Sequence, residues 1–152
     1  MGPGIYTIVL KLDRPIEIPV GSLGAIYFRQ GYYAYTGSAR GPGGLKRVER
    51  HLDVLCGRKS CRRWHIDYIL PHTSLVEVVA TRTAMDLECE IARAIGEDLA
   101  VVRGFGSTDC GCIGHLHHSP GLDEIIDVVR AAHRTREGMP WQDSGFSAMD
   151  HR

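Results

Sequence analysis

Two tyrosine triplets, with the arginine and histidine that follow them, are the residues of this sequence best suited to chemistry. The triplets are Gly4–Tyr6 and Tyr35–Gly37, and each lies in a run rich in strand-forming residues. The second leads through a glycine-rich stretch into a helical pattern that carries Arg47 and His51, which are i, i+4 neighbours. Two phenols on neighbouring strands beside a guanidinium could hold a phosphodiester and a hydroxyl group, because arginine offers bidentate donors to phosphate oxygens.

Taken one at a time, these residues also have ordinary structural interpretations. A strand tyrosine such as Tyr6 or Tyr35 commonly packs in a core, and a lone helix arginine such as Arg47 is commonly solvated. The two triplets, their order and the helix face that follows them together favour a binding or catalytic site.

Charge is distributed unevenly, although the formal net charge is zero. The segment Arg40–Arg63 holds eight basic residues and two acidic ones, whereas Ala84–Asp98 holds five acidic residues and one basic residue. This polarity suits a site that meets a polyanion on one side and holds a cation on the other. The alternative is two solvated helix faces of opposite sign. The residues expected to contact a nucleic-acid backbone are Arg40, Lys46, Arg50, Arg62 and Arg63.

Alternation and turn signals predict the strands that position these residues. Ile5–Leu12 alternates as a half-buried strand that starts with Tyr6 on its apolar face. Pro15–Gly24 is rich in breakers and predicts a loop. Ala25–Phe28 and Tyr32–Thr36 predict two further strands that are joined as a short hairpin.

The rest of the chain predicts helices around one more strand. An apolar stripe predicts a helix that starts near Gly44, and Trp64–Leu70 is compatible with either a helix or a strand. Leu75–Thr81 predicts a strand, and Thr83–Glu97 and Leu122–His133 predict helices. These elements indicate an α/β (α+β) fold, with a small, mainly antiparallel sheet of three or more strands flanked by helices.

Length and composition predict one soluble domain. The 152 residues suffice for a single core, which we assign to residues 1–134, with residues 135–152 as a polar tail expected to be mobile. We find no apolar run long enough to span a membrane and no secretory leader, so no membrane partner is expected. Five cysteines without an export signal argue against a disulfide framework, and the expected compartment is the cytoplasm.

The order of these features resembles the GIY-YIG nuclease superfamily. That order is a strand with GIY, a hairpin with YTG, a helix with arginine and histidine, a strand, and a helix with glutamate. The phrases GPGGLKRVERHL, WHIDYIL and GFGSTDCGCIGHL resemble its small archaeal and bacterial subgroup, which is sometimes associated with endonuclease III. The core resemblance covers Gly4–Ile95, and the subgroup phrases extend it to His117.

The resemblance implies a metal-dependent endonuclease that hydrolyses phosphodiester bonds, most readily those of DNA, in DNA repair. Tyr6 would act as, or position, the general base for water, and Tyr35 would bind and orient nearby. Arg47, or less readily Arg50, would stabilise the transition-state phosphate, and His51 matches a histidine one turn after Arg47. Because a free phenol has a pKa of about 10, Tyr6 would need a cation such as Arg47 beside it to favour its phenolate.

The same resemblance implies a divalent metal and a partner. Glu88 would bind Mg²⁺ or Mn²⁺, ions that prefer carboxylate and water ligands. Glu90 flanks the same apolar stripe on its other side, and periodicity does not choose between the two glutamates. A DNA-repair protein is the partner that this family likeness implies.

One departure from the family pattern concerns asparagine. The superfamily often places an asparagine late in the domain, and this chain has none. Asp109 or a backbone group would have to take that role. The alternative function is therefore a non-catalytic nucleic-acid-binding or repair-accessory domain with the same fold.

A second group of potential ligands lies late in the chain. Cys110, Cys112, His115 and His117 could hold a structural zinc ion, because thiolate and imidazole are zinc ligands. The spacing is not a common zinc signature, so the alternative is a glycine-shaped turn with small buried cysteines.

The segment WHIDYIL leaves one more question open. Its polar pair, His65 and Asp67, could line the cleft of the site. In the other interpretation, Trp64, Ile66 and Ile69 form core while the polar pair faces water, and the sequence favours this one slightly.

Overall fold

The computed structural model describes residues 2–39, 41, 43–107, 110–135 and 140–141. The strands are β1 (Gly4–Leu12), β2 (Ile16–Pro19), β3 (Ala25–Phe28), β4 (Gly31–Ala39), β5 (Ser74–Arg82), β6 (Ala100–Val101), β7 (Leu116–Ser119) and β8 (Pro140–Trp141). The helices are α1 (Arg47–Leu55), α2 (His65–Ile69), α3 (Glu88–Gly96) and α4 (Leu122–Arg134), with short 3₁₀ turns at Gly21–Leu23, Gly44–Lys46 and Leu70–His72.

An antiparallel sheet forms the centre of the fold. Its strand order is β6-β7-β4-β1-β5-β8, and β2 and β3 pair as a separate two-stranded sheet. β1 pairs with β4 on one side and with β5 on the other. Tyr6 lies opposite Gly37 in the β1–β4 register, so the two triplets are direct neighbours across one strand pair.

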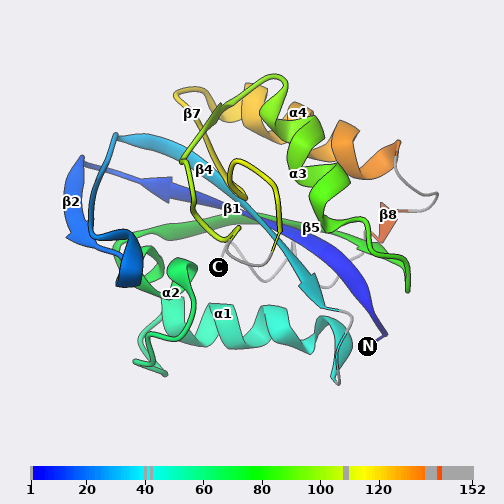
Figure 1. Cartoon of the computed structure of the whole chain (residues 1–152), viewed down its shortest axis with the longest axis horizontal. Coiled ribbons are helices and arrows are strands. Elements are labelled where there is room, and N and C mark those ends of the chain that lie inside the picture. The colour runs from blue at the N-terminus through cyan, green and yellow to red at the C-terminus, as the bar shows by residue number, and fades with distance from the viewer. Residues whose placement is uncertain (1, 40, 42, 108–109, 136–139, 142–152) are drawn as a thin grey trace.

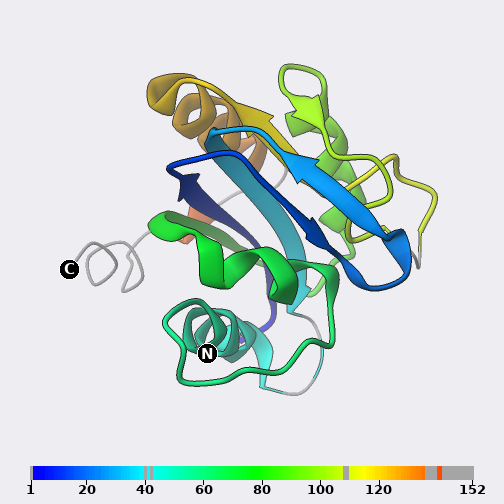
Figure 2. The same cartoon turned by 90° about the vertical axis from the view of Figure 1, so that its left-hand side faces the viewer.

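Helices cover both faces of this sheet (Figure 1). α1 and α2 lie on one face, whose core includes Tyr6, Ile8 and Leu10 of β1. α3 and α4 lie on the opposite face, over Ile5 and Val9 of the same strand. The turned view shows the sheet between the two helix pairs (Figure 2). The expected α+β class, with a mainly antiparallel sheet flanked by helices, is confirmed.

β1 differs from the expected half-buried strand. Within Gly4–Leu12 only Lys11 is exposed, so the strand is buried on both faces. The prediction was wrong because the second helix layer also covers the face that carries Thr7, whose hydroxyl makes the sequence look half polar. Tyr6 nevertheless lies on the face predicted for it, with Ile8 and Leu10.

Pairing in the N-terminal half also differs from the prediction. β3 and β4 do not form a hairpin, because β3 pairs with β2 whereas β4 pairs with β1 and β7. The segment Pro15–Gly24, predicted as a loop, contains β2. The hairpin was predicted because the two strands are close in the chain. In the structure both sides of β4 are occupied, by β1 and by β7, so β3 pairs with β2.

Later elements follow the prediction more closely. The strand at Leu75–Thr81 and the helix at Leu122–His133 are present as β5 and α4, and the ambiguous segment Trp64–Leu70 contains α2. The helix expected over Thr83–Glu97 starts only at Glu88. Of the predicted tail, Pro140–Trp141 pairs with β5, and residues 136–139 and 142–152 lie outside the described residues.

A polar network lies within the core on the α4 face. The hydroxyl oxygens of Thr7 and Thr36 are 2.9 Å apart. His133 bridges Thr7 and Thr81, with nitrogen-to-oxygen distances of 2.8 and 2.9 Å. Burial lowers the pKa of His133 to about 3, so this ring is neutral. Thr36, the middle residue of the second triplet, therefore ties the core together on the face opposite the tyrosines. Of the helices in the described ranges, none is long and apolar enough to cross a lipid bilayer.

Candidate functional site

A cavity of about 230 Å³ brings together all five side chains expected to do chemistry. These are Tyr6, Tyr35, Arg47, His51 and Glu88. The other lining residues are Gly37, Ser38, Arg63, Trp64, His65 and Gly106. Residues from β1, β4, α1, α2 and α3 thus converge on one space, as a shared site requires.

A hydrogen bond between strand and helix stands at this cavity wall. The Tyr6 hydroxyl on β1 lies 2.7 Å from His51 Nε2 on α1. A Cβ atom at Gly37 would come within 2.5 Å of the Tyr6 hydroxyl oxygen. The glycine of the second triplet therefore leaves the room that this hydroxyl occupies, and any larger residue would displace it.

Burial sets the charge state of this pair. Burial raises the pKa of Tyr6 well above its usual value and outweighs the opposing effect of Arg47. Burial, with the nearby charge of Arg50, lowers the pKa of His51 to about 3. Both groups are neutral near pH 7, so the expected phenolate at Tyr6 is not favoured. His51 Nδ1 is buried and finds no hydrogen-bond partner among the described residues.

Tyr35 stands beside this pair, under a loop. Its ring lies edge-on to that of His51, with centroids 5.9 Å apart, and burial raises its pKa. The loop after β6 passes over the tyrosine at Gly106, which has a φ of +73° and whose Cβ would lie 3.2 Å from the Tyr35 ring. The Gly106 N–H donates to His65 Nδ1 at 2.8 Å. His65 therefore lines the cavity and does not point simply into water.

Trp64 gathers three arginines around its ring. The guanidinium carbons of Arg47, Arg50 and Arg63 lie 5.0, 4.0 and 5.3 Å from the ring centroid. Arg47 also donates to the Ser38 carbonyl at 2.8 Å. Within the described residues Arg47 has no carboxylate partner, so its remaining donors are available to an anion in the cavity.

Arg50 is engaged in a different way. Its two terminal nitrogens donate to the two carboxylate oxygens of Asp67 at 3.0 and 2.9 Å. Asp67 is buried and also accepts from the backbone N–H groups of Arg63 and Trp64. Burial opposes ionisation, but these hydrogen bonds lower the pKa of Asp67. Arg50 is thus paired with Asp67, and Asp67 does not face water.

The other expected backbone contacts have different surroundings. Lys46, Arg62 and Arg63 are exposed, and Arg63 also borders the cavity. Arg40 and Asp109, the residue suggested in place of the missing asparagine, lie outside the described residues.

Glu88 is the acidic residue of the cavity. It is the first residue of α3, and its Oε2 accepts from His115 Nδ1 at 3.0 Å. Glu90 is exposed and does not line the cavity, so the choice that periodicity left open falls on Glu88. Burial tends to lower the pKa of His115, but the hydrogen bonds to Glu88 and Cys112 outweigh it and raise that pKa to about 9.

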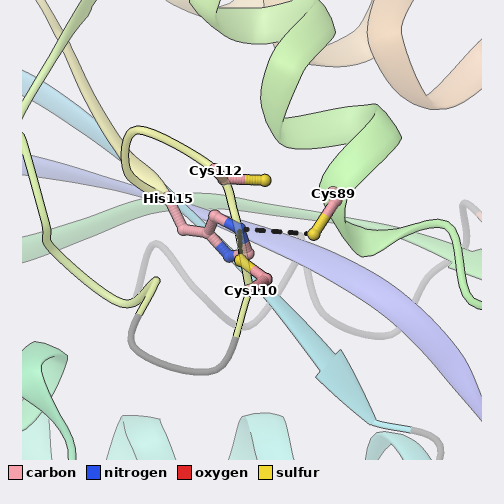
Figure 3. Close-up of side chains that lie close together, drawn as sticks. All are labelled: Cys89, Cys110, Cys112 and His115. Atoms are coloured by element: carbon pink, nitrogen blue, oxygen red, sulfur yellow. Dashed lines mark hydrogen bonds between the residues drawn. The ribbon is translucent and has the colours of Figure 1, made fainter.

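The imidazole of His115 and three thiols form a cluster beside Glu88 (Figure 3). The donor atoms of Cys89, Cys110, Cys112 and His115 all lie within 4.8 Å of one another. His115 Nε2 is 3.5 Å from Cys110 Sγ and 3.9 Å from Cys89 Sγ. This cluster could bind a metal ion, and its soft donors suit zinc better than Mg²⁺ or Mn²⁺.

The cluster corrects the predicted ligand set at one position. His117 is the fourth member of the predicted set, but it packs near Gly96 of α3, and the fourth residue of the cluster is Cys89. Cys89 lies 26 residues before His115 along the chain, so no local spacing connects the two. Trp64 was not assigned to the site, although an aromatic residue next to a basic connector was a usable signal. His65 was considered for the cleft, but the sequence slightly favoured water.

A family model described as "Domain of unknown function DUF123" matches residues 5–137. No curated protein matches the chain, and no solved structure does. DUF123 is a family distinct from the GIY-YIG nucleases, so the identification drawn from the triplets is wrong. Three-residue motifs are short, and here each has a local structural reason, such as the room that Gly37 leaves for Tyr6.

Proposed function

The chain belongs to the DUF123 family, and we propose that it hydrolyses nucleic-acid phosphodiester bonds, those of DNA before those of RNA. The observation that supports this proposal is the convergence of its five candidate side chains on one cavity. A neutral Tyr6–His51 pair, an arginine with available donors and a carboxylate each have ordinary roles alone. Together they offer the groups that phosphodiester hydrolysis needs.

Arg47 binds the phosphate in this proposal. Its guanidinium is held by Trp64 and by the Ser38 carbonyl, so it is oriented before substrate arrives. Because the cavity wall excludes part of the solvent, fixed donors there stabilise the growing charge on the non-bridging oxygens without reorganisation. Such preorganised donors are worth about 2.7–4 kcal/mol in the barrier.

Tyr6 and His51 handle the proton. Among the described residues His51 Nε2 is the acceptor within reach of the phenolic proton of Tyr6, so we assign the tautomer in which Nε2 accepts it. The Tyr6 oxygen can then accept a hydrogen bond from water. As that water attacks phosphorus, its proton passes to Tyr6 while the phenolic proton passes to His51. The pair thus serves as a base without a free phenolate, and the strand–helix hydrogen bond keeps it aligned. The negative charge of the bound phosphate would offset the burial that holds the pKa of His51 near 3.

Glu88 is the residue that could hold the divalent cation. One of its carboxylate oxygens accepts from His115, which leaves the other for Mg²⁺ or Mn²⁺. A single carboxylate meets the minimum for these ions, since water and phosphate oxygens can fill the other positions. When bound, the ion would neutralise phosphate charge and assist the leaving group.

The surroundings of the cavity suggest how substrate is held. Exposed Lys46, Arg62 and Arg63 would contact the phosphate backbone, which supplies affinity without sequence choice. We therefore propose recognition of nucleic-acid structure rather than sequence. All five cysteines are free thiols, which suits the cytoplasm as the compartment. The expected role in DNA repair, and its protein partner, rested on the family likeness alone and are not carried further.

Cleavage of labelled nucleic acid tests this function. Wild type, Tyr6→Phe and Glu88→Ala are compared on single-stranded and double-stranded DNA and RNA with Mg²⁺ or Mn²⁺. General-base catalysis is worth about 10²–10⁴-fold, so Tyr6→Phe should lose that much activity. Tyr33→Phe is the matched control. Tyr33, on β4, is buried like Tyr6, but its hydroxyl donates to the Arg29 carbonyl and it does not line the cavity.

Equal cleavage by all the variants would mean that a contaminant or another site is responsible. Binding of DNA by wild type without any cleavage would favour a non-catalytic nucleic-acid-binding domain.

A further inference from the structure

We propose that Cys89, Cys110, Cys112 and His115 form a structural zinc site, and that the bound ion fixes Glu88 in the wall of the cavity. The site lies behind Glu88 and uses none of the groups assigned to phosphate or to proton transfer. The proposal therefore stands independently of the proposed hydrolysis.

The distances between donors already fit one ion. Zinc bonds of about 2.3 Å to sulfur and about 2.0 Å to nitrogen, at tetrahedral angles, separate a sulfur from a nitrogen by about 3.5 Å. The observed separations from His115 Nε2 are 3.5 Å to Cys110 Sγ and 3.9 Å to Cys89 Sγ. All four donors lie within 4.8 Å of one another, so small shifts of the side chains would close the shell. Four protein ligands would leave no open position, as in structural zinc sites.

The imidazole of His115 is oriented for this role. Its Nδ1 lies 3.0 Å from Glu88 Oε2, so Nδ1 carries the proton and donates to the carboxylate. The other nitrogen, Nε2, then faces the sulfurs of Cys89 and Cys110 (Figure 3), and it would bind zinc through the lone pair that is freed when zinc displaces its proton. A carboxylate that accepts from the second nitrogen of a metal-bound histidine is a common supporting arrangement in zinc sites.

The ligands come from separate parts of the fold. Cys89 lies in the first turn of α3, Cys110 and Cys112 in the loop between β6 and β7, and His115 directly before β7. The loop also carries Gly106, which borders the cavity. An ion would cross-link this loop to the start of α3, and so would place Glu88 and Gly106 relative to each other.

The chain contains its own control for cysteine chemistry. Cys56 and Cys61 are exposed and lie outside the cluster, whereas the three cluster thiols are partly buried. Cys110→Ser/Cys112→Ser should therefore abolish zinc binding, and Cys56→Ser/Cys61→Ser should preserve it.

Metal content of untagged protein purified from zinc-supplemented cells tests the site. We expect about one equivalent of zinc in wild type and in the exposed-cysteine variant, and less than about a tenth in the cluster variant. Less than a tenth of an equivalent in wild type would overturn the site. Equal loss in both variants would do the same.

Two further measurements keep the test decisive if the cluster variant does not fold. Chelator-treated wild type should take up Co²⁺ with the intense visible bands of a tetrahedral thiolate site. Thiol counting under denaturing, non-reducing conditions should find all five cysteines reduced. Absence of the Co²⁺ bands, or fewer than three thiols in the Cys56→Ser/Cys61→Ser variant because two cluster cysteines have formed a disulfide, contradicts the zinc site.

The link to Glu88 has a readout that needs no activity. Removing an outer carboxylate typically weakens a metal site by about 10–100-fold, so Glu88→Gln should lower zinc affinity in chelator competition by at least about 10-fold. Glu90→Gln, on the same helix but exposed, should leave zinc affinity unchanged. Equal affinities for Glu88→Gln and wild type would overturn the link.

Discussion

Two buried histidines, one on each face of the sheet, differ in whether they line the cavity. His51 on α1 bonds Tyr6, and His133 on α4 bonds Thr7, the next residue of β1. Burial lowers the pKa of both rings to about 3. His133 uses its second nitrogen on Thr81, whereas His51 Nδ1 finds no partner among the described residues. Tyr6 and His51 line the cavity described above, and neither Thr7 nor His133 is among its lining residues.

The contrast shows that a depressed pKa marks burial and does not by itself mark function. The His51 pair differs because His51 has a ring nitrogen without a partner among the described residues and because the pair lines the cavity. We call groups of this kind open, and groups whose hydrogen bonds are all made within the fold closed. The arginines repeat the contrast, because Arg50 is closed by the bidentate bonds of Asp67 while Arg47 keeps donors available. We interpret the closed groups as structural and the open groups as functional.

The largest expected effect is the loss of cleavage when Arg47, the open arginine, is replaced by lysine. The same replacement of Arg50, the closed arginine, should affect stability instead. Arg47→Lys should lower the cleavage rate by about 10²–10³-fold, because a lysine cannot reproduce preorganised bidentate donors. Arg50→Lys should instead lower the unfolding free energy by about 1–3 kcal/mol, since the buried carboxylate of Asp67 loses half of its fork. Cleavage per folded molecule and urea unfolding are measured for both. The distinction breaks if Arg50→Lys is the variant that loses cleavage.

The two histidines should contribute equally to the pH dependence of the unfolding free energy. Each has a folded pKa of about 3, below the unfolded value near 6.5, so the unfolded state binds more protons between these values. Stability conferred by the neutral rings is full above pH 6.5 and is lost as the pH falls towards 3. Each ring contributes a slope of about 1.4 kcal/mol per pH unit once the pH is well below 6.5.

Urea unfolding between pH 7 and pH 4.5 measures this slope. His51→Gln and His133→Gln should each reduce it by the same amount, because both remove one buried, titrating ring. An unchanged slope in either variant would show that its histidine is protonated or exposed in the folded state.

Salt dependence should reveal the smallest difference. Arg62 is exposed and donates to two backbone carbonyls, whereas Arg58 on the same connector is paired with Asp53 at 2.8 Å. Arg62→Ala should reduce the salt slope of DNA affinity by about 1, the loss of one phosphate contact. Arg58→Ala should change it less. Fluorescence anisotropy at several salt concentrations gives both slopes, and a larger change for Arg58→Ala would reverse the assignment.

Sequence reasoning reached the open groups more easily than the closed ones. The tyrosines, Arg47 and His51 lie in or beside local motifs, and Glu88 was implied by the family resemblance; the structure brings all five to one cavity. The family assigned from those motifs was wrong, because such short patterns are shared between families.

Contacts between distant segments could not be predicted. Asp67 was expected to face water because the sequence does not show that Arg50, seventeen positions earlier, closes over it. Cys89 was missed as a cluster member because α3 and the β6–β7 loop meet only in the folded sheet. The burial of the second face of β1 was missed for the same reason, because an alternating pattern indicates one covered face and does not show that a helix layer covers the other.

The most direct test of this account compares His51→Gln with His133→Gln in the same cleavage assay, scaled to the folded fraction. Glutamine can accept a hydrogen bond but cannot take a proton, so His51→Gln should lose about 10²-fold or more in rate while remaining folded. His133→Gln should keep the wild-type rate per folded molecule and show a lower melting temperature. Equal rates for the two variants, or a loss confined to His133→Gln, would contradict the claim that the open pair performs the chemistry.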